Sequence, residues 1–306
     1  MSTLLTRQQG KQAETNFARQ RPKKSRRPLT WSTLREANLV THAILLVGGF
    51  FWVYPFLWAL GTSLKSVQEF TSSGLSLWPQ QPQWANYLNA WNDASFGQYF
   101  VNTVFTTIFT VVFVVMFTSM AGYVLARVRF VGKKIIFGII ALTLFLPHGY
   151  TIVPIFDIVQ RLGLLDTLWS IILVQVAGGM VFNTLLFSGY FTTIGKDMEE
   201  AARIDGASFH QIFWRVMFPL AAPMMATVAL MTFIAAWNSY FIPLVFTLGN
   251  PELRTLPVGL YTFSAEHATS WTLLCAGSVM SLLPIIIIFV FLQRYFIQAV
   301  AGAIKG

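Results

Sequence analysis

Residues 199–206 read Glu-Glu-Ala-Ala-Arg-Ile-Asp-Gly, and this stretch, which continues to Pro219, is the most charged part of the second half of the chain. Apolar runs of about 20 residues or more, long enough to cross a bilayer, flank it on both sides. A charged segment between two such runs is typical of a connection at a membrane surface. The stretch therefore separates membrane spans and is itself exposed to water.

The same residues predict two short helices joined by a turn. Residues 198–204 are mostly good helix formers, and Gly206 ends the run because glycine readily adopts the conformation of a sharp turn. Ser208 is placed to cap a second helix, in which apolar residues recur at helical spacing. We therefore predict a helix–turn–helix elbow. Its small residues Ala201 and Ala202 would let another protein surface approach closely.

The overall composition is that of a membrane protein. The 306 residues are 55% hydrophobic and 11% charged, whereas soluble domains carry about 25% charged residues. The sequence has no regular alternation of the kind found in barrel strands, which disfavours a β-barrel. A single cysteine, Cys275, excludes an internal disulfide. The sequence thus predicts an all-α, polytopic membrane protein.

Six apolar runs are candidates for membrane spans. We place them at about 39–61, 100–125, 135–156, 168–192, 223–248 and 272–296. Residues 1–36 are expected to form a disordered basic tail, and residues 37–306 the membrane domain. Segments 62–98 and 249–271 are expected as external loops, and 193–222 as the cytoplasmic elbow.

The distribution of basic residues predicts the orientation. With both termini in the cytoplasm, 18 of the 21 Lys and Arg residues lie inside and 3 lie outside. This asymmetry favours six spans with both ends cytoplasmic. The net charge of +9 would by itself suggest a nucleic-acid partner, but membrane topology accounts for it, so none is expected.

The elbow carries a spaced pattern. Glu200-Ala201-Ala202 is followed after three residues by Gly206, and after nine more by Val216-x-Phe218-Pro219. This resembles the EAA loop of the permeases of ATP-binding-cassette (ABC) importers, with Val and Phe in place of the pattern's Ile and Leu. Both replacements are apolar and leave the spacing intact.

Other stretches resemble the carbohydrate-uptake branch of these permeases, in particular the six-span subunit of maltose-type systems. In chain order they include Tyr54-Pro55, Ser63-Leu64-Lys65, Tyr123 to Arg127, Leu162 to Thr167, Trp237-Asn238, Leu256 to Leu260, and the end of the chain from Gln293 to Gly306. Together they cover nearly all of residues 50–306. The tail before residue 36 lies outside the resemblance.

The resemblance implies the type I ABC importer permease fold in the cytoplasmic (inner) membrane of a prokaryote. It implies a companion permease subunit in a heterodimer, two ATP-binding subunits, an external solute-binding protein and a carbohydrate as solute. ATP and Mg²⁺ would be bound by the partner subunits, since this chain has no Walker-type phosphate loop, and we expect no cofactor, metal or catalytic residue here.

Two regions would contact the ATP-binding subunits, by resemblance. The coupling residues are Glu199, Glu200, Ala201, Ala202, Arg203, Ile204, Asp205 and Gly206. The last residues, 299–306, are small and are expected to be a flexible tail between the two ATP-binding subunits, with Lys305 and Gly306 in contact.

Polar residues inside the spans are candidates for a solute path, because such residues are costly in lipid. They are Asn102, Gln175, Asn183, Thr232, Asn238 and Ser239, and Trp237 and Tyr240 join them as aromatic neighbours. Amides and hydroxyls beside aromatic faces suit a neutral, polyhydroxylated solute. The alternative role for any one of them is to join helices to one another.

The sequence argues against two other classes of function. An ion-coupled secondary transporter would need charged residues within the spans, and these spans have essentially none. A scaffold without transport activity does not explain the polar span residues or the proline-bent helices. The same importer machinery carrying a polyol or glycerol phosphate remains the alternative to a carbohydrate.

Overall fold

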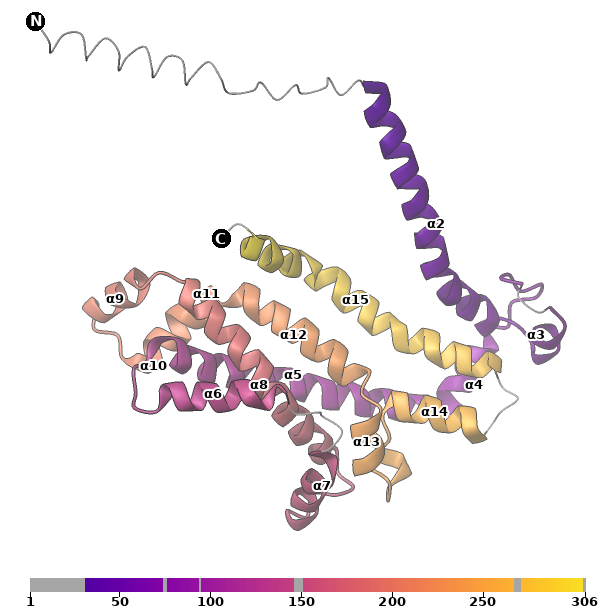
Figure 1. The fold of residues 1–306 in the computed structure, drawn as a ribbon. Coiled ribbons are helices and arrows are strands. Elements are labelled where there is room, and N and C mark those ends of the chain that lie inside the picture. The colour runs from indigo at the N-terminus through magenta and orange to yellow at the C-terminus, as the bar shows by residue number, and fades with distance from the viewer. Residues whose placement is uncertain (1–30, 74–75, 94, 146–150, 267–270, 305–306) are drawn as a thin grey trace, which may run out of the picture. The chain divides into compact units, whose positions relative to one another are not determined.

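The computed structural model describes residues 31–73, 76–93, 95–145, 151–266 and 271–304, and this part of the chain contains helices and no strand (Figure 1). The helices of the first half are α2 (Trp31–Ser63), α3 (Val67–Ser73), α4 (Ala85–Asp93), α5 (Phe96–Arg127), α6 (Lys133–Thr143) and α7 (Ile152–Arg161). The second half contains α8 (Leu168–Thr193), α9 (Asp197–Ile204), α10 (Phe209–Ile212), η2 (Phe213–Met217), α11 (Phe218–Leu220), α12 (Ala222–Trp237), α13 (Phe241–Phe246), η3 (Pro251–Leu253), α14 (Leu256–Glu266) and α15 (Trp271–Ile304).

The chain divides into two compact units, residues 1–55 and 56–306. The division falls inside α2 at Pro55. The helix begins at Trp31, so residues 31–36 are helical and the expected disordered tail ends earlier than predicted. The remainder of that tail, residues 1–30, lies outside the described residues.

Four described helices are long and apolar enough to cross a membrane: Leu39–Ser63, Phe96–Arg127, Leu168–Thr193 and Trp271–Phe291. They coincide with the first, second, fourth and sixth predicted spans. A fifth candidate is a bent pair, Phe209–Leu220 with Ala222–Trp237, whose two parts meet at 73°. The predicted count of six and the cytoplasmic placement of both ends remain predictions.

The third and fifth predicted spans are not single helices. The third, 135–156, consists of α6 and α7, and the residues between them include 146–150, which lie outside the described part of the chain. The fifth, 223–248, ends its first helix at Trp237. The amide of Asn238 donates to the Ile234 carbonyl at 2.8 Å, and Pro243 lacks a donor for a continuing helix, so α13 starts as a separate element.

The centre of the second unit is the pair α5 and α8, which pack along each other. A buried core of Val114 and Tyr123 from α5 with Ile172, Phe187 and Phe191 from α8 joins them to the elbow. A second core lies where α5 meets α4, α12, α14 and α15, and a third where α8 meets α7 and α13. Helix α5 therefore contacts most of the second unit.

A ladder of threonines runs along the buried face of α5, at positions Thr103, Thr106, Thr107, Thr110 and Thr118. The hydroxyls of Thr103, Thr106 and Thr118 each donate to the backbone carbonyl of the residue four positions earlier, at 2.6 to 2.9 Å. The helix itself therefore satisfies much of its polar surface, and its small side chains allow neighbouring helices to approach closely.

Two segments that the sequence predicted as a loop and a flexible tail contain helix instead. The predicted external loop 249–271 contains α14, and Leu256 and Val258 of that helix are buried. The helix forms because its apolar residues find a surface on α5 and α15. At the other end of the chain, the expected flexible tail from residue 299 is wrong: α15 continues to Ile304. Ala and Ile are compatible with a helix, and no proline interrupts 299–304.

Candidate coupling elbow and candidate solute pocket

The elbow is built as a helix, a glycine turn and a second, irregular helix. Gly206 has φ of +80°, the left-handed conformation that favours glycine. Ser208 then caps α10: its hydroxyl accepts from the Gln211 N–H, and the Gln211 side chain accepts from the Ser208 N–H. The second helix continues as one turn of π-helix, η2, and α11, so it is less regular than the sequence predicted.

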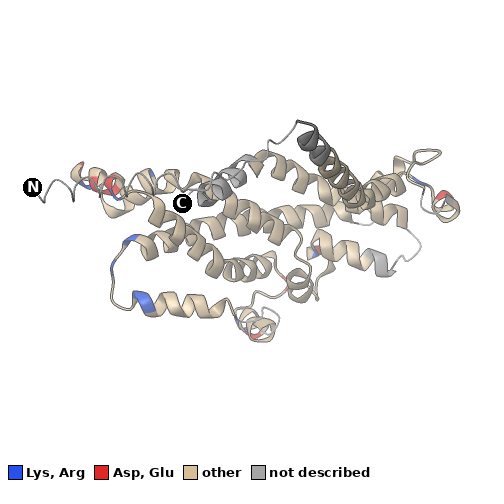
Figure 2. Cartoon of the chain, turned by 45° about the horizontal axis from the view of Figure 1, so that its top comes forward, with Lys and Arg blue, Asp and Glu red and all other residues tan. Residues whose placement is uncertain are grey.

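Most of the predicted coupling residues lie on the surface of α9. Ile204 is 86% exposed, and Glu200, Ala201, Arg203 and Asp205 are exposed as well. Charged residues of both signs gather at this elbow and basic residues at the loop before α6, whereas the long helices carry few charges (Figure 2).

Two of the predicted coupling residues face inward instead. Glu199, which was expected at the surface, is buried, and its Oε1 lies 2.8 Å from Arg127 Nε of α5. Ala202 is half-buried against the core shared with α5 and α8. The helical period explains both, because residues 199 and 202 lie on the face of α9 that points toward the bundle.

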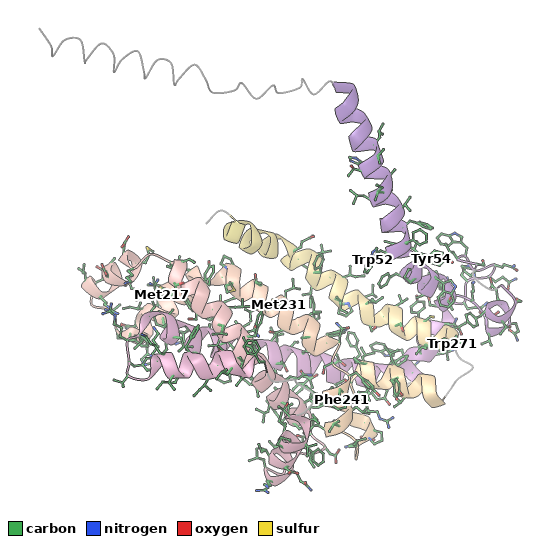
Figure 3. The ribbon with its side chains drawn as sticks, in the orientation of Figure 1. Trp52, Tyr54, Met217, Met231, Phe241 and Trp271 are labelled. Atoms are coloured by element: carbon green, nitrogen blue, oxygen red, sulfur yellow. The ribbon has the colours of Figure 1, made fainter. Side chains whose placement is uncertain are left out.

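Beside the turn is a hollow of about 420 Å³. It is lined by Ala202, Asp205, Gly206, Ala207, Gln211, Arg215 and Val216. Its lining combines an exposed arginine and an exposed aspartate with small residues. Met217, labelled in Figure 3, closes the core beneath the elbow and is fully buried.

A second concavity lies between α8 and α12, with a volume of about 380 Å³. Its lining residues are Thr110, Val174, Gln175, Gly178, Gly179, Phe182, Asn183, Met231, Thr232, Ala235, Ala236, Ser239 and Ile242. Met231, labelled in Figure 3, marks its place on α12. Four of the eight predicted solute-path residues, Gln175, Asn183, Thr232 and Ser239, meet in this pocket although they come from two separate spans.

The polar side chains of the pocket are incompletely hydrogen-bonded. The Gln175 carbonyl oxygen accepts from Thr110 at 3.1 Å, and the Asn183 amide donates to the Gly179 carbonyl at 2.8 Å. The remaining polar atoms, Gln175 Nε2, Asn183 Oδ1 and Thr232 Oγ1, are buried without a hydrogen-bond partner. Unpaired buried polar atoms are costly, so one donor, one acceptor and one hydroxyl at this pocket would be stabilised by a polar molecule that paired with them.

The other four predicted residues lie elsewhere. The buried amide of Asn102 donates to the backbone carbonyls of Glu252 and Arg254, and Trp237 Nε1 donates to the Ser281 carbonyl. These two join helices to neighbouring segments, which was the alternative role. Asn238 is exposed, and the Tyr240 ring lies 5.0 Å from that of Tyr261.

Sequence reasoning missed Thr110 and Arg127 as site residues. Thr110 belongs to the threonine ladder of α5, whose spacing of three and four residues marks one face of a helix and was the available signal. Arg127 ends an apolar span, where a basic residue is expected for topology alone, so nothing in the sequence distinguished its second role.

The comparison with known families decides the class of protein. Residues 118–302 match the family described as binding-protein-dependent transport system inner membrane component. The chain belongs to this family. The permease is 32% identical to the permease protein of a diacetylchitobiose uptake system from Streptomyces coelicolor, over 90% of this chain and 89% of the relative. It is 34% identical to a melibiose, raffinose and stachyose import permease from Bacillus subtilis, over 82% of this chain and 91% of the relative.

The fold agrees with that assignment. The permease superposes with a TM-score of 0.75 on a chain of a bacterial ABC transporter involved in the import of alginate, an acidic polysaccharide, at 30% identity. The match covers 86% of this chain and 97% of the other. The protein is therefore an inner-membrane permease subunit with the type I ABC importer fold. The elbow, α8 and α12 all lie within residues 118–302, the part of the chain that matches the family.

Proposed function

We propose that this permease carries a carbohydrate across the inner membrane, and that the pocket between α8 and α12 is part of the solute's route. The observation that carries the proposal is the meeting of Gln175, Asn183, Thr232 and Ser239 in one concavity, with three of their polar atoms buried and unpaired. A sugar supplies hydroxyls that both donate and accept, so it can pair with all three atoms.

The pocket favours a neutral solute over glycerol phosphate. None of the residues that line it, all within the described part of the chain, is charged. A phosphate in an apolar membrane protein requires an arginine, a lysine or a helix N-terminus nearby. The several relatives named for oligosaccharides are consistent with this solute class.

The remaining parts of the importer are supplied by other chains. We propose a companion permease, two ATP-binding subunits that hold ATP and Mg²⁺, and an external binding protein that delivers the solute. The exposed face of α9, with Ile204 as an apolar projection, would dock on an ATP-binding subunit, and the hollow beside Gly206 would receive part of that subunit. The last residues, Lys305 and Gly306, lie outside the described residues, and their predicted contact stays a prediction.

The test uses the complete importer in lipid vesicles with its binding protein. Uptake is measured for neutral di- and trisaccharides, a polyol and glycerol 3-phosphate. We expect uptake of a saccharide, and uptake of glycerol 3-phosphate alone would contradict the proposal. Gln175→Met and Asn183→Leu remove hydrogen-bonding atoms at similar volume, and each should lower uptake about tenfold. Asn92→Leu, at an exposed position of α4, is the control and should transport normally.

A further inference from the structure

The contact between Arg127 and Glu199 is an ion pair shielded from water. Arg127 Nε lies 2.8 Å from Glu199 Oε1, and each side chain is 8% exposed. The two residues come from different elements: Arg127 ends α5, and Glu199 lies in the first turn of α9. Removing one partner of such a pair leaves a buried charge without compensation, so the pair fixes the position of α9 relative to α5.

The same guanidinium holds a second point of the connection. Arg127 Nη2 donates to the carbonyl of Ile194, the residue that follows the end of α8. Arg127 therefore holds both ends of the segment from Ile194 to Glu199. The contact of Nε with Glu199 is an ion pair and not an aligned hydrogen bond, so charge attraction holds α9 while the hydrogen bond from Nη2 holds Ile194.

One turn earlier on α5, Tyr123 attaches the second helix of the elbow. Its ring lies 5.3 Å from the rings of Phe209 and Phe213, and 5.6 Å from that of Phe191. Tyr123 is 1% exposed. The final turn of α5 thus contacts both helices of the elbow, one through charge and the other through aromatic packing.

Helix α5 also reaches the solute pocket. It runs without a proline from Phe96 to Arg127, and Thr110 near its middle donates to Gln175. At 1.5 Å per residue, Thr110 and Arg127 are about 25 Å apart along the helix. The chain itself connects the elbow to the pocket on two sides. Helix α8 lines the pocket and ends shortly before α9, and beyond the elbow the chain passes through the π-helical turn η2 and a 73° bend before α12. Helix α5 is a third connection, joined to both helices of the elbow through Arg127 and Tyr123.

We propose that the Arg127–Glu199 pair is the contact through which movement of α9 reaches α5 and, along α5, the pocket. Arg127 and Glu199 act as positioning residues, and the inference rests on the proposed function of the elbow. This role of Glu199 differs from the docking role proposed for the exposed residues of α9, because Glu199 is buried against Arg127 of the same chain.

The first experiment is a double-mutant cycle in the complete importer, with uptake per ATP hydrolysed as the measurement. Arg127→Gln and Glu199→Gln should each lower this ratio about tenfold while ATP hydrolysis continues. The exchanged pair, Arg127→Glu with Glu199→Arg, should recover most of the ratio. Arg129→Gln, at an exposed position two residues further on, is the control and should match the wild type. Single variants with an unchanged ratio would overturn the inference.

A second experiment does not depend on the stability of those variants. Cysteines at Met120 of α5 and Asp197 of α9, both exposed, are spin-labelled in a protein whose Cys275 is replaced by alanine. The distance between the labels is measured in the nucleotide-free importer and in the ATP-bound importer. We expect the distance to stay the same, since α9 and the end of α5 move together. A change in the distance between these two states would overturn the inference.

The two proposals fail in different ways. If the wild-type importer transports none of the saccharides, the proposed function is wrong whatever the labels report. If the wild type transports a saccharide and the label distance changes with ATP, the function stands and the role of the ion pair is wrong.

Discussion

Gly122 of α5 lies against Phe187 of α8 at a distance that leaves no room for a side chain. A Cβ added at Gly122 would come within 2.5 Å of Phe187 Cβ and 2.9 Å of the Ser188 backbone nitrogen. The contact lies in the core beneath the elbow, where backbone atoms cannot move aside easily. The close packing of α5 on α8 therefore depends on glycine at this position.

Gly122→Val should separate the two helices. Overpacking of a core costs about 1–3 kcal/mol, and contact with backbone atoms places this change at the upper end. We expect a lower melting temperature of the purified protein and poor recovery of the assembled importer. Gly189→Val, on α8 where an added Cβ meets nothing within 4 Å, is the control. Equal melting temperatures for the two variants would show that α5 and α8 are not packed this closely.

Asn102→Leu should lower stability without changing which solute is carried. The change removes three hydrogen bonds. Two are donated to the carbonyls of Glu252 and Arg254 at 2.7 and 3.0 Å, and the third is accepted from the Gln98 amide at 3.3 Å. The expected loss is about 1–3 kcal/mol. The measurements are the melting temperature and the relative uptake of the saccharide panel. Asn89→Leu, at an exposed position of α4, is the control. A changed solute preference in Asn102→Leu would show that Asn102 contacts the solute after all.

Gly206→Val should disturb the elbow through the backbone alone. No atom lies within 4 Å of an added Cβ, so the cost comes from φ of +80°, about 1 kcal/mol or more for a β-branched residue. We expect α9 to tilt and the binding-protein-stimulated ATPase activity to fall. Phe209→Leu keeps an apolar side chain at the same elbow and should be mild. Wild-type ATPase stimulation in Gly206→Val would show that the angle of the turn does not matter.

Ala201→Trp separates docking from packing at the elbow. Ala201 is exposed, so a large side chain there fits the isolated chain but obstructs a partner that approaches α9. We expect normal membrane insertion and melting temperature, with loss of co-purifying ATP-binding subunits. Normal co-purification would mean that the partner docks on another surface.

Single cysteines at Ser72 and Lys196, with Cys275 replaced, test the orientation predicted from basic residues. Both positions are exposed. An impermeant thiol reagent should label Ser72→Cys only from outside and Lys196→Cys only from inside. Labelling of both from the same side would contradict the six-span topology.

Local features of this protein were determined by the sequence itself. The glycine at 206, the serine at 208 and the run of helix formers before them define the elbow because capping and turn conformations depend on a few neighbouring residues. The apolar lengths of α2, α5, α8 and α15 were likewise readable, since the thickness of the bilayer dictates them. The EAA spacing indicated the family for the same local reason.

Only the tertiary structure decided which polar residues act together. Gln175 and Thr232 are far apart in sequence, and their meeting at one pocket depends on how α8 and α12 pack. The sequence predicts Glu199 as a surface charge, whereas the structure places Arg127 of α5 beside it. The sequence likewise predicts Asn102 as a solute contact, whereas in the structure its amide donates to the carbonyls of Glu252 and Arg254. Hydropathy and spacing report the environment of each residue along its own helix. They carry no information on which other helix faces it, because that is settled by the fit of whole helix surfaces.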